Sequence, residues 1–326
     1  MKKFAARSMA LAGVVLIVII GTAYSQRYLY RIFQSDYDRH ALIIDVFKKQ
    51  SSVRNIIVFG GSQSMFGIDT KQIDEVLKYD GEIFNLSSAG QNLFESSYFY
   101  SLIDTTTELV IQCVSPSLFT KNKDHRLFED KAISMFLSGY RIDEETRKLI
   151  KDYNTFFDRS TFINYIDSRT YYKSYVHNLI RPFFDNEQFD KSVRTSLSFP
   201  HIYTIDRHPN YPVYACNCEE YFFYEHPSSQ LRFLADVKEF FDNKGIKYIL
   251  MFMPVNPDEC HDCYEDFKTY KRMIEDETGI ETIDLSGLIK DANLFYDAYH
   301  PNKAGAKIIS SEIALQLLPI VSQIAQ

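Results

Sequence analysis

The chain has 326 residues, of which 45% are hydrophobic and 24% charged, with a formal net charge of −7 at pH 7. This composition excludes a globally disordered chain, and the acidic balance without a basic face argues against nucleic acid as a partner. The length fits one α/β domain that carries an insertion.

The amino terminus has the pattern of a membrane-targeting segment. Lys2, Lys3 and Arg7 precede an apolar run from about 9 to 20. Such a charged flank and apolar run are typical of a signal peptide or of an uncleaved anchor. Both readings predict export.

A possible cleavage site follows the apolar run, because 23–25 reads Ala-Tyr-Ser. The chain then continues without a linker into Arg27-Tyr28-Leu29-Tyr30-Arg31. We therefore expect an anchor over 1–25 and a juxtamembrane helix over 26–50. The positive-inside rule then leaves the rest of the chain extracytoplasmic, in the periplasm or at the cell surface, or secreted if the segment is cleaved.

From residue 51 onward, apolar runs alternate with amphipathic segments. Asp69 is expected to cap a helix with Ile73, Val76 and Leu77 on one face, and Gly245 to end a later helix that Ser228 or Ser229 begins. A final helix is expected from Gly305 onward. Short apolar runs predict strands at 56–59, 83–86, 109–114, 246–253 and 282–285.

This alternation predicts an α/β fold over 51–326, a three-layer αβα sandwich with a parallel central sheet. The alternation of strand and helix patterns stops at about 118–226. Within this stretch 143–158 and 160–180 look helical, and aromatic residues are dense. We interpret this stretch as a helical insertion over the carboxyl edge of the sheet. Binding sites of open α/β sheets lie at that edge.

Four of the five cysteines form two close pairs, Cys216 with Cys218 and Cys260 with Cys263. In an exported protein they indicate two disulfides of undetermined connectivity, whereas a zinc site that stabilises a scaffold is the alternative. Cys113 lies in an apolar run and is expected to be a buried strand residue.

A serine follows the first expected strand and two glycines. Gly60 and Gly61 permit the tight strand-to-helix turn from which a nucleophilic Ser62 would project. Phosphate binding by this glycine-rich turn is the alternative, but no lysine follows it. Ser64 is a competing nucleophile.

The second polar segment lies near the carboxyl terminus, in Asp297-x-x-His300-Pro301-Asn302. A short turn there lets Asp297 orient the His300 ring while the other ring nitrogen faces a serine. Pro301 is expected to open the following helix. The alternative is a helix N-terminus with incidental polar residues.

With these two segments the chain resembles the SGNH/GDSL hydrolase superfamily, and in particular its membrane-anchored acyltransferase branch. Gly61 stands where the superfamily has the aspartate of Gly-Asp-Ser, and that branch often lacks this residue too. The resemblance implies a flavodoxin-like sandwich and a triad of Ser62, His300 and Asp297.

The resemblance also implies an oxyanion hole. The amides of Ser62 and Gly90 match two of the superfamily's donors. The asparagine of the third block is absent, and Ser117 falls nearest to its position. Asn92 and Gln63 are possible substitutes, although either residue could instead cap a helix or hold a loop.

We therefore expect an exported, membrane-anchored serine O-acyltransferase or esterase without cofactor or metal. Its partners would be an acyl donor and a cell-surface or secreted glycan acceptor, and a membrane protein that supplies acyl groups. A catalytically impaired glycan-binding or assembly subunit is the alternative function.

Overall fold

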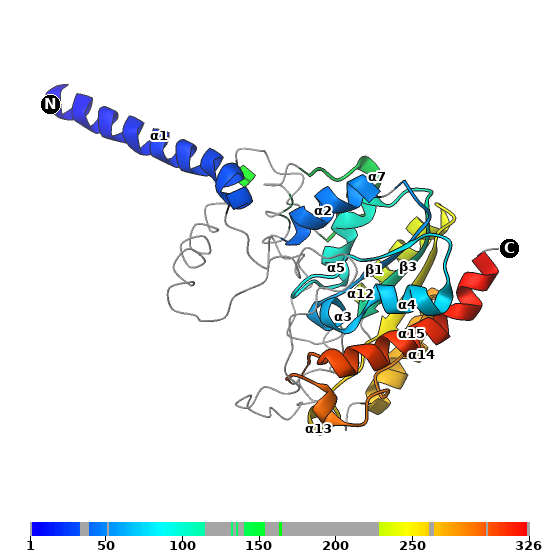
Figure 1. The fold of residues 1–326 in the computed structure, drawn as a ribbon. Helices are drawn as coiled ribbons and strands as arrows, with labels where there is room; N and C mark the ends of the chain where they lie inside the picture. The colour runs from blue at the N-terminus through cyan, green and yellow to red at the C-terminus, as the bar shows by residue number, and fades with distance from the viewer. Residues whose placement is uncertain are drawn as a thin grey trace.

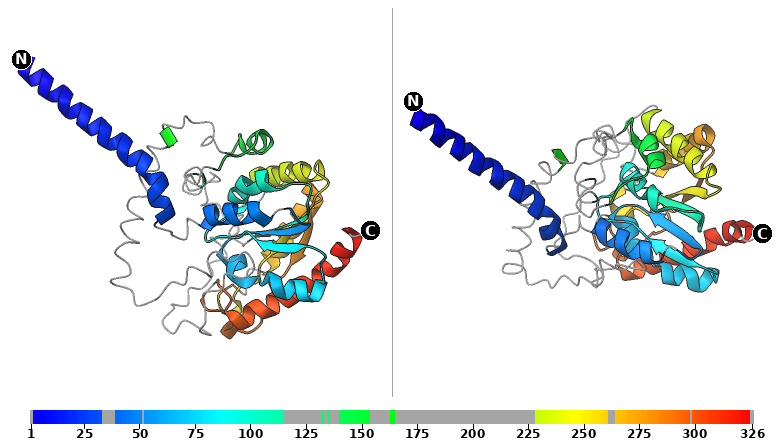
Figure 2. Two further views of the ribbon diagram at one scale, coloured as in Figure 1. Left: turned by 45° about the horizontal axis from the view of Figure 1, so that its top comes forward. Right: turned by 90° about the horizontal axis from the view of Figure 1, so that it is seen from above.

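The computed structural model describes residues 2–32, 39–50, 52–114, 132, 135, 140–153, 163–164, 228–260, 264–297 and 299–324. Within them the chain forms the expected α/β sandwich, with one parallel sheet between two layers of helices (Figures 1 and 2). The strand order is β2-β1-β3-β4-β5. Most of the expected insertion, including 154–162 and 165–227, lies outside the described residues.

All five predicted strands are confirmed, with ends that differ by one or two residues. The strands carry buried apolar side chains, as parallel strands require, and the two strands at the sheet edges each begin with an exposed glutamate. The strands are β1 (Asn55–Phe59), β2 (Glu82–Asn85), β3 (Thr107–Val114), β4 (Lys247–Phe252) and β5 (Glu281–Asp284).

One face of the sheet is covered by α4 (Thr70–Leu77) and α15 (Lys303–Ile324), with the short α3 (Ser62–Gly67) beside α15. Asp69 caps α4 as predicted, because its side chain accepts the amides of Lys71 and Gln72. Ile73 faces the core, but Val76 is 41% exposed, so the predicted apolar face was one residue too wide.

The opposite face is covered by a larger set of helices around an aromatic-rich core. Gly245 ends α12 with a φ of 68°, in the left-handed region that favours glycine, as predicted. The described elements on this side are α2 (Arg39–Gln50), α5 (Leu93–Ser96), the 3₁₀ helix η2 (Ser97–Leu102), α7 (Glu144–Ile150), α12 (Ser228–Asp242) and α14 (Tyr264–Thr278).

The folded domain begins earlier than residue 51. Ile43, Ile44 and Phe47 of α2 are at most 2% exposed and belong to the same core as the helices above. The segment expected as one juxtamembrane helix is therefore divided: the first helix, α1 (Lys2–Ile32), runs on to residue 32, and α2 is part of the domain.

Helix α1 extends away from the sheet domain (Figure 1). Its described apolar side chains include Phe4, Met9, Leu11 and Ile17, which are 66–78% exposed. Within the described residues, α15 is the helix long and apolar enough to cross a membrane, and 7–21 forms a shorter apolar stretch.

A membrane span is one explanation of the apolar character of α15, and packing in the core is a second. Ile309, Ile313 and Leu317 recur at four-residue spacing, are at most 1% exposed, and pack against the sheet. This confirms the predicted line of buried residues in the last helix.

We predict that Ile313→Ala lowers the free energy of unfolding by about 2–5 kcal/mol, because it leaves a cavity under α15. Leu315→Ala is the matched control on the same helix, since Leu315 is 56% exposed, and should change stability by no more than about 0.5 kcal/mol. Chemical denaturation of the full chain in detergent measures both. Equal effects of the two substitutions would contradict the packing of α15 on the sheet.

Candidate active site

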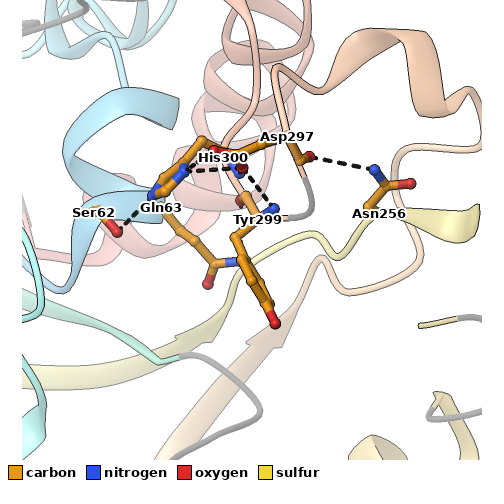
Figure 3. Close-up of polar contacts among 6 residues, drawn as sticks. All are labelled: Ser62, Gln63, Asn256, Asp297, Tyr299 and His300. Carbon is orange, nitrogen blue, oxygen red and sulfur yellow. Dashed lines mark hydrogen bonds and ion pairs between the residues drawn. The ribbon is translucent and has the colours of Figure 1, made fainter. Parts of the chain in front are cut away.

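The three predicted triad side chains lie in one hydrogen-bonded row (Figure 3). His300 Nε2 is 2.7 Å from Ser62 Oγ, and His300 Nδ1 is 2.8 Å from Asp297 Oδ2. Ser62 and His300 are 238 positions apart in the chain. One nitrogen of the ring thus faces the hydroxyl while the other faces the carboxylate, which is the arrangement that activates a serine.

Ser62 occupies the start of α3, directly after β1. Gly61, its preceding residue, has φ −82° and ψ −163°, which any residue can adopt. The need for glycine at 60 and 61 is therefore one of space, not of unusual backbone angles as the sequence suggested. A Cβ on Gly60 would collide with Ser64 Oγ and lie 2.8 Å from Cys113 Cβ, and one on Gly61 would lie 3.1 Å from the Gln91 carbonyl oxygen.

Ser64, the competing nucleophile, is fully buried, and its hydroxyl donates to the carbonyl of Gly61 at 2.9 Å. It holds the turn and does not face His300. Cys113 lies beside it and is a buried strand residue, as expected. Its thiol is free, and burial raises the pKa of that thiol well above its ordinary range.

Asp297 is held by a tight loop that follows β5. Its Oδ1 accepts the backbone amides of Tyr299 at 2.9 Å and His300 at 2.8 Å. Burial alone would raise the pKa of this carboxyl, but the hydrogen bond and charge of His300 and the two amides outweigh it and leave the pKa of Asp297 below its ordinary value. The carboxylate is therefore ionised and able to fix the imidazole tautomer.

Two further side chains hold in place the loop that carries Asp297 and His300, which we call the histidine loop. Gln63 Nε2 donates to the Tyr299 carbonyl at 3.2 Å, which ties the serine helix directly to the loop, and Asn256 Nδ2 donates to the Asp297 carbonyl at 3.3 Å. Phe66 packs edge-on against the His300 ring, with ring centroids 5.7 Å apart. The sequence offered Gln63 as an oxyanion donor, but its amide is engaged in this tie.

Asn302, not Pro301, is the residue that caps the start of the last helix. Its Oδ1 accepts the amides of Ala304 and Gly305, both at 3.0 Å, and α15 starts at Lys303. The expectation that Pro301 opens the helix was wrong, because proline stands one residue before the cap. Gly305 is required for space, since a Cβ there would collide with the Leu294 carbonyl.

Gly90 has a φ of 66°, in the left-handed region, and lies in a turn closed by the Gln91 amide on the Ser88 carbonyl at 3.1 Å. Asn92 caps α5: its side chain accepts the Glu95 amide, while Glu95 accepts the Asn92 amide, both at 2.9 Å. The side-chain oxygen of Asn92 is thus used in the cap. Ser117 lies outside the described residues, as do Cys216, Cys218 and Cys263 and the side chain of Cys260.

Sequence reasoning missed Arg39 and His40, which are buried beside this site. The signal was present, because both residues lie on the helical face of α2 that also carries Ile43, Ile44 and Phe47. No group of three or more potential metal-ligating side chains occurs among the described residues.

Comparison with models of protein families gives no match, and comparison with curated proteins gives no similar sequence. The geometry of the site therefore carries the functional argument.

We predict that Asp297 makes stability depend on acid pH. Its folded pKa lies below its unfolded value of about 3.9, so its contribution is fully present above that value and is lost as pH falls through the folded pKa. The stability difference between the wild type and Asp297→Asn should thus be constant from about pH 7 to 5 and shrink below about pH 4. Urea denaturation at each pH measures it.

A His300→Leu background is the control for this measurement, because it removes the ring that bonds the carboxylate. The pH-dependent difference should be smaller there. A difference that stays unchanged between about pH 6 and 3 in the otherwise native chain would contradict the assigned contacts of Asp297.

Proposed function

We propose that the protein is a serine-dependent O-acyltransferase or esterase, anchored in a membrane through α1, that acts on a cell-envelope glycan. The observation that carries the proposal is the continuous row from Ser62 Oγ through His300 to Asp297, with bonds of 2.7 and 2.8 Å. A buried serine bonded only to backbone would not support it. The side-chain exposures, 19% for His300 and 9% for Asp297, leave the ring edge accessible while the acid is enclosed.

The chemistry follows from the donors and acceptors in the row. His300 Nε2 takes the proton of Ser62 as Oγ bonds to the acyl carbon, and then gives that proton to the departing oxygen of the donor. In the second half, His300 deprotonates a sugar hydroxyl or water that attacks the Ser62 ester, and returns the proton to Ser62 Oγ. Asp297 stays ionised and stabilises the imidazolium throughout.

The oxyanion formed in each half would be stabilised by the amides of Ser62 and Gly90, with Ser117 as a third donor. The asparagine that serves as a donor in the superfamily is absent, and loss of one such donor costs about 3 kcal/mol of transition-state stabilisation. We therefore expect slow hydrolysis by water. A glycan acceptor held close to the acyl-enzyme would react faster, because proximity lowers the barrier.

The exposed apolar side chains of α1 support the membrane anchor. A helix of 31 residues is about 46 Å long, more than the roughly 30 Å of a bilayer core, although its strictly apolar part is shorter. Exposed apolar surface on this scale is unfavourable in water and favourable in lipid. The glycan and the acyl-supplying membrane partner rest on the family resemblance, and the extracytoplasmic side rests on the positive-inside rule.

We predict that the full chain in detergent hydrolyses 4-nitrophenyl acetate slowly and that Ser62→Ala lowers kcat/KM at least about 10³-fold, because the nucleophile is lost. Ser64→Ala is the matched control two residues away: that hydroxyl bonds the Gly61 carbonyl and does not face His300, so activity should stay within about tenfold of the wild type. Release of 4-nitrophenolate measures each rate.

Adding cell-envelope polysaccharide should shorten the lifetime of the acyl-enzyme if the protein is a transferase, and leave it unchanged if it is an esterase. The enzyme proposal fails if Ser62→Ala retains wild-type activity. A Ser62→Ala protein that still supports glycan acylation in cells would instead favour the glycan-binding or assembly subunit.

A further inference from the structure

Helix α2 begins with two polar residues on its buried face. Arg39 is 2% and His40 1% exposed, although a guanidinium and an imidazole are costly to remove from water. Burial lowers the pKa of Arg39 to about 9. Arg39 Nε donates to the Ser87 carbonyl at 2.8 Å and an Nη to the Asn85 carbonyl at 3.1 Å. These bonds join α2 to the end of β2 and to the segment that follows it.

His40 continues this link through a chain of hydrogen bonds with a fixed direction. Ser88 Oγ donates to Gln91 Oε1 at 2.7 Å, and Gln91 Nε2 donates to Ser96 Oγ at 2.9 Å. Since the single hydroxyl hydrogen of Ser88 is used on Gln91, the 2.8 Å contact with His40 Nε2 requires the ring to donate. The His40 ring also stacks on Phe99, at 5.4 Å between centroids.

These hydrogen bonds hold the turn 88–91, which lies against the turn that carries Ser62. The Ser88 amide donates to the Gly60 carbonyl at 3.1 Å, and the Gln91 carbonyl lies close against Gly61. Gly90, at the left-handed position of the turn, therefore has its peptide set by the Ser88–Gln91 clamp on one side and by contact with 60–61 on the other.

Asn85 also connects the serine helix α3 to α2. Its Nδ2 donates to the carbonyls of Ser64 at 3.1 Å and Ile68 at 3.2 Å, around α3, while its own carbonyl accepts from Arg39. Buried and fully enclosed, Asn85 links the serine helix to α2.

We propose that Arg39 and His40 are positioning residues for the reaction, which fix the turn 88–91 and thereby aim the Gly90 amide at the oxyanion formed beside Ser62. The inference rests on the proposed function and adds residues that touch neither substrate nor triad. It also gives α2 a role in positioning the site.

The test distinguishes the hydrogen bond that the His40 ring donates to Ser88 from the packing of that ring on Phe99. His40→Phe keeps a ring to stack on Phe99 and removes the bond to Ser88. His40→Gln removes the ring and keeps an amide N–H able to reach Ser88. Single-turnover acylation by 4-nitrophenyl acetate, followed as 4-nitrophenolate release by the full chain in detergent, should slow about 10- to 100-fold in His40→Phe and recover at least most of that loss in His40→Gln. The half-saturating ester concentration should stay unchanged in both.

A double-mutant cycle with Ser88→Ala strengthens the test. Ser88→Ala removes the hydroxyl that bonds both His40 and Gln91, so adding His40→Phe to the Ser88→Ala background should slow acylation little further. The midpoint of thermal unfolding, measured for each variant, shows whether the change in acylation rate follows a change in the stability of the fold.

The inference is overturned if His40→Phe acylates at the wild-type rate, or if His40→Gln is as slow as His40→Phe. Ser62→Ala keeps the two proposals apart. If Ser62→Ala is inactive while His40→Phe is fully active, only the positioning role fails. If Ser62→Ala keeps the native rate, the proposed function fails, and the positioning role with it.

Discussion

The hydrogen bond between Ser62 and His300 joins segments 238 positions apart, and its 2.7 Å length depends on how the sheet places their two loops. Ser62 follows β1, near the middle of the sheet, whereas the histidine loop follows β5 at its edge. The loop reaches back to β1 because α15, which starts just after it, packs beside α3 and α4. Burial of α15 against the sheet is thus the apolar force that brings the polar groups together.

Close backbone approach recurs at each junction around the site. Gly60 and Gly61 leave room for Ser64, Cys113 and the turn 88–91, and Gly305 leaves room for the Leu294 carbonyl. A Cβ at Gly60 or Gly305 would displace these neighbours, and one at Gly61 would press on the carbonyl of Gln91. The precision of the site comes from this packing together with ties such as Gln63 to Tyr299 and Asn256 to Asp297.

The strands were predictable because most are short apolar runs buried within the sheet, and the triad because serine, acid and histidine stood at informative spacings. Local features that depend on three-dimensional neighbours were not. Nothing adjacent in sequence shows that Gly60 faces Cys113 or that Val76 points to solvent. Arg39 and His40 carried a readable signal, as polar residues on an apolar helix face, but only their contacts with 85–88 give them a role.

The site and the fold together support a covalent acyl-enzyme at Ser62 as the central claim. The most direct measurement is mass spectrometry of the full chain after treatment with a fluorophosphonate, with peptide mapping of the adduct. The account predicts one adduct, on the peptide containing Ser62 and localised to that serine, with loss of labelling in His300→Leu. Absence of an adduct in the folded native chain, or an adduct on another residue that persists in Ser62→Ala, would contradict it.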